Sequence, residues 1–368
     1  MSKASNIFVK IFKKLLIFLV SLIVLLVVGE VVARIAEPGP MALMDANPYV
    51  KPYKGLPQFH KPNFEGRWDG TWYGTNSIGL RGPEITMEKG ADEFRVVALG
   101  DSCTFGKSVE EDETWPRQLE TMLNSEFTDG RTAVVANCGV NGFSGKNYLK
   151  MFQVIGQRLN PDLVIVGYNL NDFPNVQKKI DEKMHSVTKT RSAVTKIVGG
   201  QKNLDRFNES ALYRWLRAFY RDMTREESWK GAENLAKNEK TDAVLKKAKQ
   251  QAASPEHMEA LEKELVGLKT AAEAAGARIA FFLFPYESLV YLDEYDTTPI
   301  DRLRGICEKI DAPFVDLAEK FRDTARETDP KREMFIYGDR YHPRPIGYRV
   351  VAENVIDVLR ERGWLNQD

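Results

Sequence analysis

Short apolar runs alternate with amphipathic stretches along much of the chain. Five runs have the length and composition of buried strands, and they are Arg95–Leu99, Thr132–Asn137, Asp162–Tyr168, Arg278–Pro285 and Ala312–Leu317. Helical spacing of apolar residues marks Trp115–Phe127, Lys146–Leu159, Glu259–Gly276, Ile300–Ile310 and a last helix from Pro345 to about Arg362. Strands that alternate with helices indicate a parallel sheet covered on both faces. The pattern therefore predicts an α/β fold, a flavodoxin-like three-layer α/β/α sandwich with a five-stranded parallel sheet.

The alternation is interrupted at about residues 174–255, where the chain is charged and has no strand-like run. We interpret this region as a helical insertion after the third strand, lying over the edge or mouth of the sheet. Its best amphipathic stretch is Ala211–Met223. The lysine-rich stretch "DAVLKKAKQQAA" is expected to be a solvated face rather than a binding patch.

The N-terminus carries a continuous apolar segment. Leu15–Gly29 contains no charge, and Val31–Ala36 extends it toward the roughly 20 residues that span a bilayer. The lysines that precede it are Lys3, Lys10, Lys13 and Lys14. This charge bias predicts that residues 1–36 form a cytoplasmic N-terminus and an uncleaved transmembrane anchor, with the rest of the chain outside the cytoplasm. A cleaved signal peptide is the alternative.

Residues 37–93 are rich in proline, glycine and aromatic side chains. This composition predicts an extended stalk with a few short strands that packs on a main domain at residues 94–368. The aromatic residues expected to make this packing are Tyr49, Tyr53, Phe59, Phe64, Trp68, Trp72 and Tyr73. A sugar-stacking platform is the alternative use of the same rings.

Composition excludes some partners. Lysine plus arginine and aspartate plus glutamate both number 52 in the 368 residues. The chain therefore has no net positive charge that would favour binding to nucleic acid. Three cysteines are too few for a disulfide scaffold and lack metal-binding spacing. The sequence does not decide whether one disulfide bridge forms, for example between Cys103 and Cys138.

Polar segments follow the first three predicted strands and precede the last helix, and two of them contain glycine. They are Gly100–Gly106, Asn137–Gly142, Asn169–Phe173 and Asp339–Pro343. Ligands of open α/β sheets bind beyond the carboxyl ends of the strands, so we expect these four segments to meet at one site.

The residues in these segments suit acyl transfer. A serine hydroxyl needs a base to become a good nucleophile, and His342 can serve Ser102 in this way. Asp339 can hold the other ring nitrogen of His342. The main-chain N–H groups of Ser102 and Gly142 and the side-chain amide of Asn171 can form an oxyanion hole.

Neighbouring residues offer alternatives. Cys103 is a possible thiol nucleophile, but we expect it to be a buried packing residue. Asp101 and Asp172 are expected to support their loops through hydrogen bonds. These aspartates, together with Asp339 and His342, have no tight spacing for a metal, so neither a metal nor another cofactor is expected.

The four segments together resemble the SGNH (GDSL-type) hydrolase superfamily. Its Gly-Asp-Ser block matches Gly100–Ser102, and its second-block glycine matches Gly142. Its third-block asparagine matches Asn171, and its Asp-x-x-His block matches Asp339 and His342. Asn169 stands where the family usually has glycine, which puts the pocket shape in question. The stretch "NSIGLRGPE" resembles a segment of membrane-anchored bacterial members, which implies an inner-membrane protein with a periplasmic domain.

The resemblance implies a serine esterase that works through an acyl-enzyme. The expected substrates are O-acyl groups, chiefly O-acetyl groups, of envelope glycans, or acylated small molecules. An O-acyltransferase to sugars and a lipid esterase or thioesterase are alternatives with the same site. A non-catalytic glycan-binding or scaffold module is the alternative from a different class. The membrane is the other expected partner.

Overall fold

The computed structural model describes residues 3–36, 48–68, 71–173, 212, 240–291, 295–328, 334–336 and 341–365. The chain divides into two compact units, one formed by residues 1–46 with 187–226 and the other by residues 47–186 with 227–368. Most of the predicted insertion, including Ala211–Met223 except for Leu212, lies outside the described residues. The domain boundaries predicted at residues 36 and 93 are a different division of the chain, and they stay predictions.

Helix α1 (Lys3–Ala36) contains the apolar N-terminal segment. Within it lies the 22-residue stretch Phe12–Ala33, whose most apolar 18 residues have a mean hydropathy of 3.1. Its large apolar side chains are exposed, as a lipid-facing helix requires. Among the described residues this helix alone is long and apolar enough to cross a membrane, and a signal sequence shares these properties.

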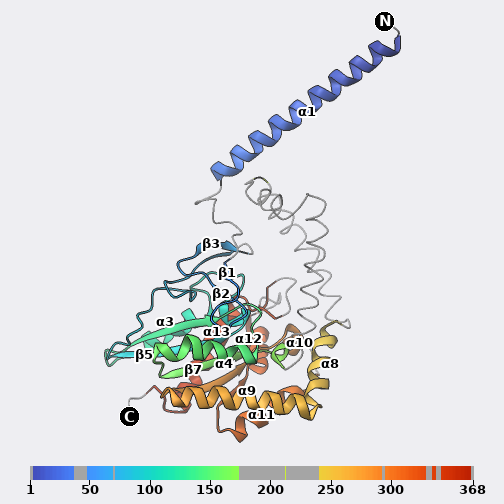
Figure 1. Ribbon diagram of the computed structural model, residues 1–368. Coiled ribbons are helices and arrows are strands. Elements are labelled where there is room, and N and C mark those ends of the chain that lie inside the picture. The colour runs from blue at the N-terminus through green and yellow to red at the C-terminus, as the bar shows by residue number, and fades with distance from the viewer. Residues whose placement is uncertain are drawn as a thin grey trace. The chain divides into compact units, whose positions relative to one another are not determined.

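The second unit is built on the predicted parallel sheet (Figure 1). Its strands are β5 (Glu93–Gly100), β6 (Thr132–Gly139), β7 (Leu163–Tyr168), β8 (Arg278–Leu283) and β9 (Phe314–Asp316). Their order across the sheet is β6-β5-β7-β8-β9, and every neighbouring pair is parallel. Because β5 lies between β6 and β7, its carboxyl end lies between theirs. The prediction of a five-stranded flavodoxin-like sheet is confirmed.

Helices cover both faces of the sheet because alternate strand residues point to opposite sides. Val96 and Ala98 pack with α3 (Trp115–Glu126), α12 (Leu317–Thr328) and α13 (Pro345–Glu361). Val97 and Leu99 pack with α4 (Gly145–Val154), α9 (Pro255–Ala274) and α11 (Thr298–Lys309). Short elements complete the unit, namely α2 (Ser102–Phe105), α10 (Glu287–Tyr291) and the 3-10 helices η2 (Gly156–Leu159) and η3 (Leu170–Asp172).

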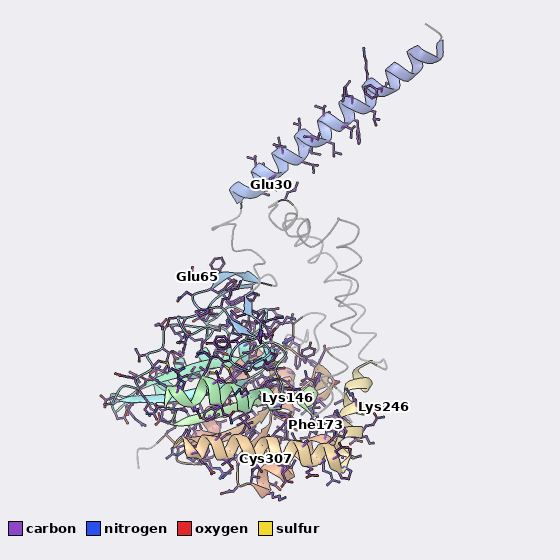
Figure 2. The ribbon with its side chains drawn as sticks, viewed as in Figure 1. Glu30, Glu65, Lys146, Phe173, Lys246 and Cys307 are labelled. Atoms are coloured by element: carbon purple, nitrogen blue, oxygen red, sulfur yellow. The ribbon has the colours of Figure 1, made fainter. Side chains whose placement is uncertain are left out.

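Helix α8 (Lys240–Ala252) exposes Lys246 and Lys249 to solvent, as predicted, and also has a buried side. Ala248 and Ala252 are buried in the same core cluster as Phe173. Their spacing of one helical turn gives α8 a narrow apolar stripe that packs beside the segment after β7. Figure 2 labels Lys246 on α8 and Phe173 at the end of that segment.

The proline-rich segment before the sheet forms two antiparallel hairpins. One pairs β1 (Tyr49–Val50) with β2 (Phe59–His60), and the other pairs β3 (Glu65–Trp68) with β4 (Thr71–Gly74). The buried aromatic side chains of this segment are Tyr49, Phe59, Phe64 and Tyr73. Their burial favours the packing role over a sugar-stacking platform.

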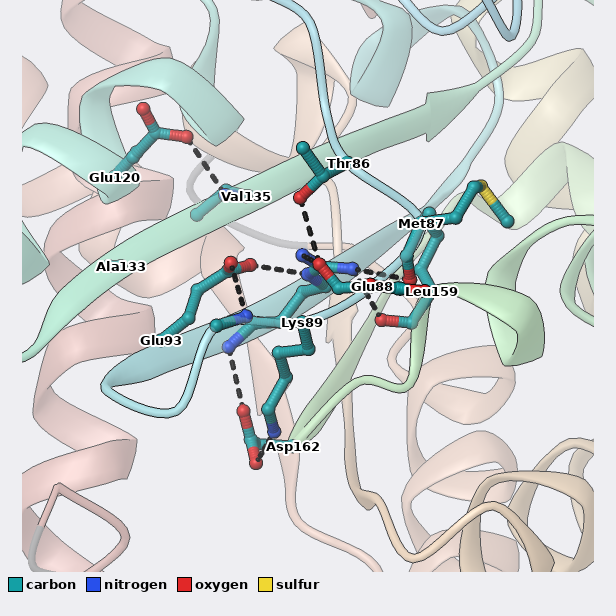
Figure 3. Close-up of polar contacts among 12 residues, drawn as sticks. Thr86, Met87, Glu88, Lys89, Glu93, Glu120, Ala133, Val135, Leu159 and Asp162 are labelled. Carbon is teal, nitrogen blue, oxygen red and sulfur yellow. Dashed lines mark hydrogen bonds and ion pairs between the residues drawn. The ribbon is translucent and has the colours of Figure 1, made fainter.

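Arg95 anchors the start of β5, at the end of the strand opposite Ser102. Its side chain has no exposed surface, and its Nη1 donates to the carbonyl oxygen of Leu159 over 2.9 Å. Its Nε is paired with Glu93, and its main-chain N–H donates to Asp162 over 2.7 Å. Figure 3 shows Glu93, Asp162 and Leu159 converging on this point. These contacts join β5 to the segment that enters β7.

We predict that Arg95→Met lowers the free energy of unfolding by about 3–5 kcal/mol. The reason is that Glu93 and the Leu159 carbonyl would stay buried without their cationic partner. Urea titration followed by circular dichroism measures the loss. Arg349→Met is the matched control, because this arginine makes an exposed pair with Glu353 on α13 and its loss is expected to cost less than about 1 kcal/mol. Equal losses in the two variants would contradict the prediction.

Candidate active site

Ser102 lies in a tight turn between β5 and α2. Asp101 caps the helix, because its Oδ1 accepts the main-chain N–H of Cys103 over 2.8 Å. The turn requires glycine at two neighbouring strand ends. A Cβ on Gly100 would lie 2.0 Å from Thr104 Oγ1, and a Cβ on Gly139 would lie 2.2 Å from the Phe105 nitrogen. These glycines let α2 lie directly against the strand ends.

His342 meets Ser102 although the two residues are 240 positions apart. The His342 Nε2 lies 2.7 Å from the Ser102 Oγ, and both residues are buried. Pro343 pairs with Phe335 through an isolated β-bridge, and the Tyr341 ring centroid lies 4.3 Å from that of His342. The 2.7 Å between Nε2 and Oγ is the distance that a serine hydroxyl and its general base require. Asp339, the predicted partner of His342, lies outside the described residues.

The two predicted oxyanion loops flank Ser102. Gly139 of β6 and Gly167 of β7 are the register partners of Gly100, so the segments that follow them leave the sheet on either side of Ser102. Gly142 has a φ of +77°, and a Cβ there would meet nothing within 4 Å. Asn171 lies in η3 with its Oδ1 buried and without a hydrogen-bond partner among the described residues. Their roles as donors stay predictions.

Asn169, which departs from the family's usual glycine, links two loops of the site. Its Nδ2 donates to Asp101 Oδ1 over 3.0 Å, and its main-chain N–H donates to Asp172 Oδ2 over 2.8 Å. The Tyr148 hydroxyl also donates to Asp172 Oδ2, over 2.7 Å. Asn169 is only 1% exposed. Its hydrogen bonds tie the turn at Ser102 to η3. The contacts of Asp101 and Asp172 are those expected of loop-supporting carboxyls.

Burial disfavours charge on both of these carboxyls. It raises the pKa of Asp101 to about 6, against the opposing effects of the Cys103 hydrogen bond and of His342. Burial also raises the pKa of Asp172 well above its usual value, and the neighbouring charge of Asp101 adds to this shift. The two groups are therefore protonated at higher pH than in the unfolded chain.

Glu264 of α9 is a third carboxyl near these loops, and it is partly buried. Burial raises its pKa to about 7, and Lys146 partly offsets the effect. Its Oε2 has no hydrogen-bond partner among the described residues. A Cβ on Gly145, the first residue of α4, would lie 2.2 Å from this oxygen. Glycine at this position therefore makes room for the carboxyl group.

Arg81 supports the nucleophile helix, a role that we did not predict from the sequence. Its Nη1 donates to the carbonyl oxygens of Phe105 and Gly106 over 3.0 and 2.5 Å, and its Nη2 donates to that of Val109 over 2.7 Å. The guanidinium carbon also lies 5.0 Å from the Phe105 ring centroid. A buried cation at the C-terminal end of α2 thus satisfies carbonyl groups that the short helix leaves free. Only its place in "NSIGLRGPE" marked this arginine in the sequence.

The cysteines are all buried and unbridged. The Cys103 Sγ lies 3.3 Å from the carbonyl oxygen of Tyr341 and has no exposed surface. Burial raises the pKa of Cys138 and of Cys307 to about 12. Within the described ranges, no group of three or more His, Cys, Asp or Glu side chains is arranged to hold a metal ion.

Comparison with known proteins places this site in a family. Residues 98–350 match the GDSL-like lipase/acylhydrolase family. This match covers more than half of the chain, and the chain therefore belongs to that family. It is a serine ester hydrolase of the SGNH type.

Similar solved structures include three esterases. An acetyl xylan esterase is 12% identical, with 72% of this chain and 100% of that chain covered and a TM-score of 0.42. A psychrotrophic esterase from Pseudoalteromonas sp. is 15% identical, with coverages of 74% and 99% and a TM-score of 0.41. A two-domain esterase active on acetylated mannans is 11% identical, with coverages of 75% and 50% and a TM-score of 0.44. No curated protein matches the chain in sequence.

The raised pKa of Glu264 predicts a stability that falls as pH rises. Between about pH 4.5 and 7 the folded protein holds a proton that the unfolded chain has released, so the free energy of unfolding decreases through this window. Glu264→Gln removes the titrating group and should flatten the decrease, leaving the variant more stable than the wild type at pH 8. Melting temperatures measured from pH 4.5 to 8 test this.

Glu259→Gln is the matched control, because Glu259 lies exposed on the same helix. It should keep the wild-type dependence of melting temperature on pH. A Glu264→Gln curve parallel to that of the wild type would show that Glu264 titrates normally.

Proposed function

We propose that Ser102, His342 and Asp339 form a catalytic triad. The observation that carries this proposal is the 2.7 Å separation of the Ser102 Oγ and the His342 Nε2 in a buried site. Asp339 would accept a hydrogen bond from the other ring nitrogen and hold His342 in the required tautomer. The N–H groups of Ser102 and Gly142 and the amide of Asn171 would donate to the oxyanion.

The reaction proceeds through two acyl transfers. His342 Nε2 takes the hydroxyl proton as the Ser102 Oγ attacks the ester carbonyl carbon, and the carbonyl oxygen becomes the oxyanion. The tetrahedral intermediate then collapses, the alkoxide leaves, and His342 gives it the proton. Water, deprotonated by His342, attacks the acyl-enzyme in the same way. The second tetrahedral intermediate formed in this way collapses, which releases the carboxylic acid and returns the proton from His342 to Ser102.

We propose that the substrates are O-acetyl groups on envelope glycans. The apolar helix α1 supports this assignment, because an anchored chain would hold the acylhydrolase domain at a membrane surface. The lysines in the N-terminal part of α1 favour a cytoplasmic N-terminus and an extracytoplasmic domain at the bacterial inner membrane. An ester hydrolase held there would meet acylated glycans.

Replacement of the nucleophile gives the first test. Ser102→Ala should lower kcat for p-nitrophenyl acetate by at least about 10⁴-fold, because Ser102 forms the acyl-enzyme in the proposed mechanism. Steady-state kinetics of the purified full-length chain measure this loss. Wild type, and equally Cys103→Ala, should be labelled at Ser102 by a fluorophosphonate. Labelling lost in Cys103→Ala but kept in Ser102→Ala would assign the nucleophile to the thiol.

Ser125→Ala is the matched control, because Ser125 is exposed on α3 and should leave kcat unchanged. The same proteins, incubated with O-acetylated bacterial polysaccharides, test the substrate. Wild type and Ser125→Ala should release acetate, and Ser102→Ala should not. Hydrolysis of the aryl ester without acetate release from any glycan would keep the esterase and reject the glycan substrate.

The orientation in the membrane has its own test. An alkaline phosphatase reporter fused after Asp368 should be active, because this enzyme needs the oxidising environment outside the cytoplasm to form its disulfides. A cytoplasmic reporter, such as a fluorescent protein that stays dark after export, provides the reciprocal fusion. An inactive phosphatase together with a bright fluorescent fusion would reverse the proposed orientation.

A further inference from the structure

The loop after β6 turns at the residue proposed as an oxyanion donor. The Phe143 N–H donates to the Val140 carbonyl over 3.1 Å, which closes a four-residue β-turn. Gly142 occupies the third position with a φ of +77°, whereas Asn141 in the second position does not have a positive φ. This combination defines a type II turn.

The type of this turn decides where the Gly142 N–H points. Types I and II differ by a rotation of about 180° of the central peptide, which here joins Asn141 to Gly142. Glycine in the third position favours type II but also adopts the backbone angles of type I without a steric penalty. Contacts from outside the turn can therefore hold this peptide in the observed direction.

Gln58 makes such a contact with the central peptide. Its Nε2 donates to the Asn141 carbonyl oxygen over 2.6 Å. The Asn141 side chain is held as well, because its Nδ2 donates to the Tyr49 hydroxyl over 2.5 Å. In a planar trans peptide the C=O and N–H bonds point in opposite directions, so a partner that holds the oxygen also sets the direction of the N–H.

The position of Gln58 is itself well defined. It precedes Phe59, which has no exposed surface and belongs to the core cluster on the α4 face of the sheet. Tyr49 pairs with His60 through the β1–β2 register. Both contacts to the turn thus come from a hairpin that precedes residues 98–350, the range that matches the family.

We propose that Gln58 is a positioning residue that fixes the Gly142 N–H toward the oxyanion formed at Ser102. A hydrogen bond to the Asn141 oxygen also polarises the shared peptide and makes its N–H a stronger donor. The hairpin at residues 49–60 is then part of the catalytic apparatus, although it contributes no group to the reacting atoms. This proposal rests on the oxyanion role proposed above for Gly142.

Two substitutions of Gln58 test the proposal by kinetics with p-nitrophenyl acetate. Gln58→Met keeps the length of the side chain but has no donor. It should lower kcat by about 10-fold or more, a part of the 10²–10³ that loss of a whole oxyanion donor costs, with KM changed by less than about 3-fold. A general loss of folding would instead lower the melting temperature and the fraction of protein that a fluorophosphonate can label.

Gln58→Glu provides a readout that a purely structural role would not produce. Its protonated carboxyl can donate to the Asn141 oxygen, whereas its carboxylate cannot. The ratio of its kcat to the wild-type kcat should therefore be highest at acidic pH and fall as the introduced carboxyl ionises. The ratio for Gln58→Met should stay constant, because every other dependence of kcat on pH is common to both proteins and cancels.

Gln157→Met is the matched control, since Gln157 is exposed in η2 at the opposite end of the sheet, and its kcat should equal that of the wild type. If Ser102→Ala is inactive while both Gln58 variants keep wild-type kcat at every pH, the positioning role is wrong and the proposed mechanism stands. If Ser102→Ala keeps full activity, the proposed mechanism fails, and the inference about Gln58 fails with it.

Discussion

The close approach of α2 to three neighbouring strand ends is the constraint on which the site depends. Gly100, Gly139 and Gly167 lie side by side in the register of β6, β5 and β7, and a Cβ on any of them would lie within 2.5 Å of an atom of α2. Because these three positions have no side chains, the helix that begins at Ser102 can turn directly over them. Ser102 therefore lies at the carboxyl edge of the sheet, with a loop from each neighbouring strand beside it.

Buried polar groups from distant segments hold these loops in place. Arg81 binds the carbonyl groups at the end of α2, and Asn169 bridges Asp101 and Asp172. Burying such groups lowers stability unless each is paired, and the raised pKa values of both aspartates reflect that cost. The arrangement gives up some stability to keep three short loops in one geometry.

The sequence predicted the sheet and the meeting of Ser102 with His342 well, because each depends on local signals. Five apolar runs defined the strands, and the ordered family segments indicated which strand ends meet. Helix α12 was not predicted, since Leu317, Phe321 and Ala325 form a stripe only one residue wide in a charged stretch. Gln58 and Arg81 gave no local signal of their roles, because their partners lie far along the chain and only the tertiary fold brings them together. The place of Asp339 stays a prediction.

The separation of Ser102 and His342 by 240 residues has a consequence for biosynthesis. His342 is held beside the start of α13, and α13 packs against α3 in the core cluster on that face of the sheet. A ribosome must therefore translate almost the whole chain before His342 and Ser102 can meet. Under the mechanism proposed above, the nascent polypeptide has a serine without its base until then and cannot hydrolyse esters.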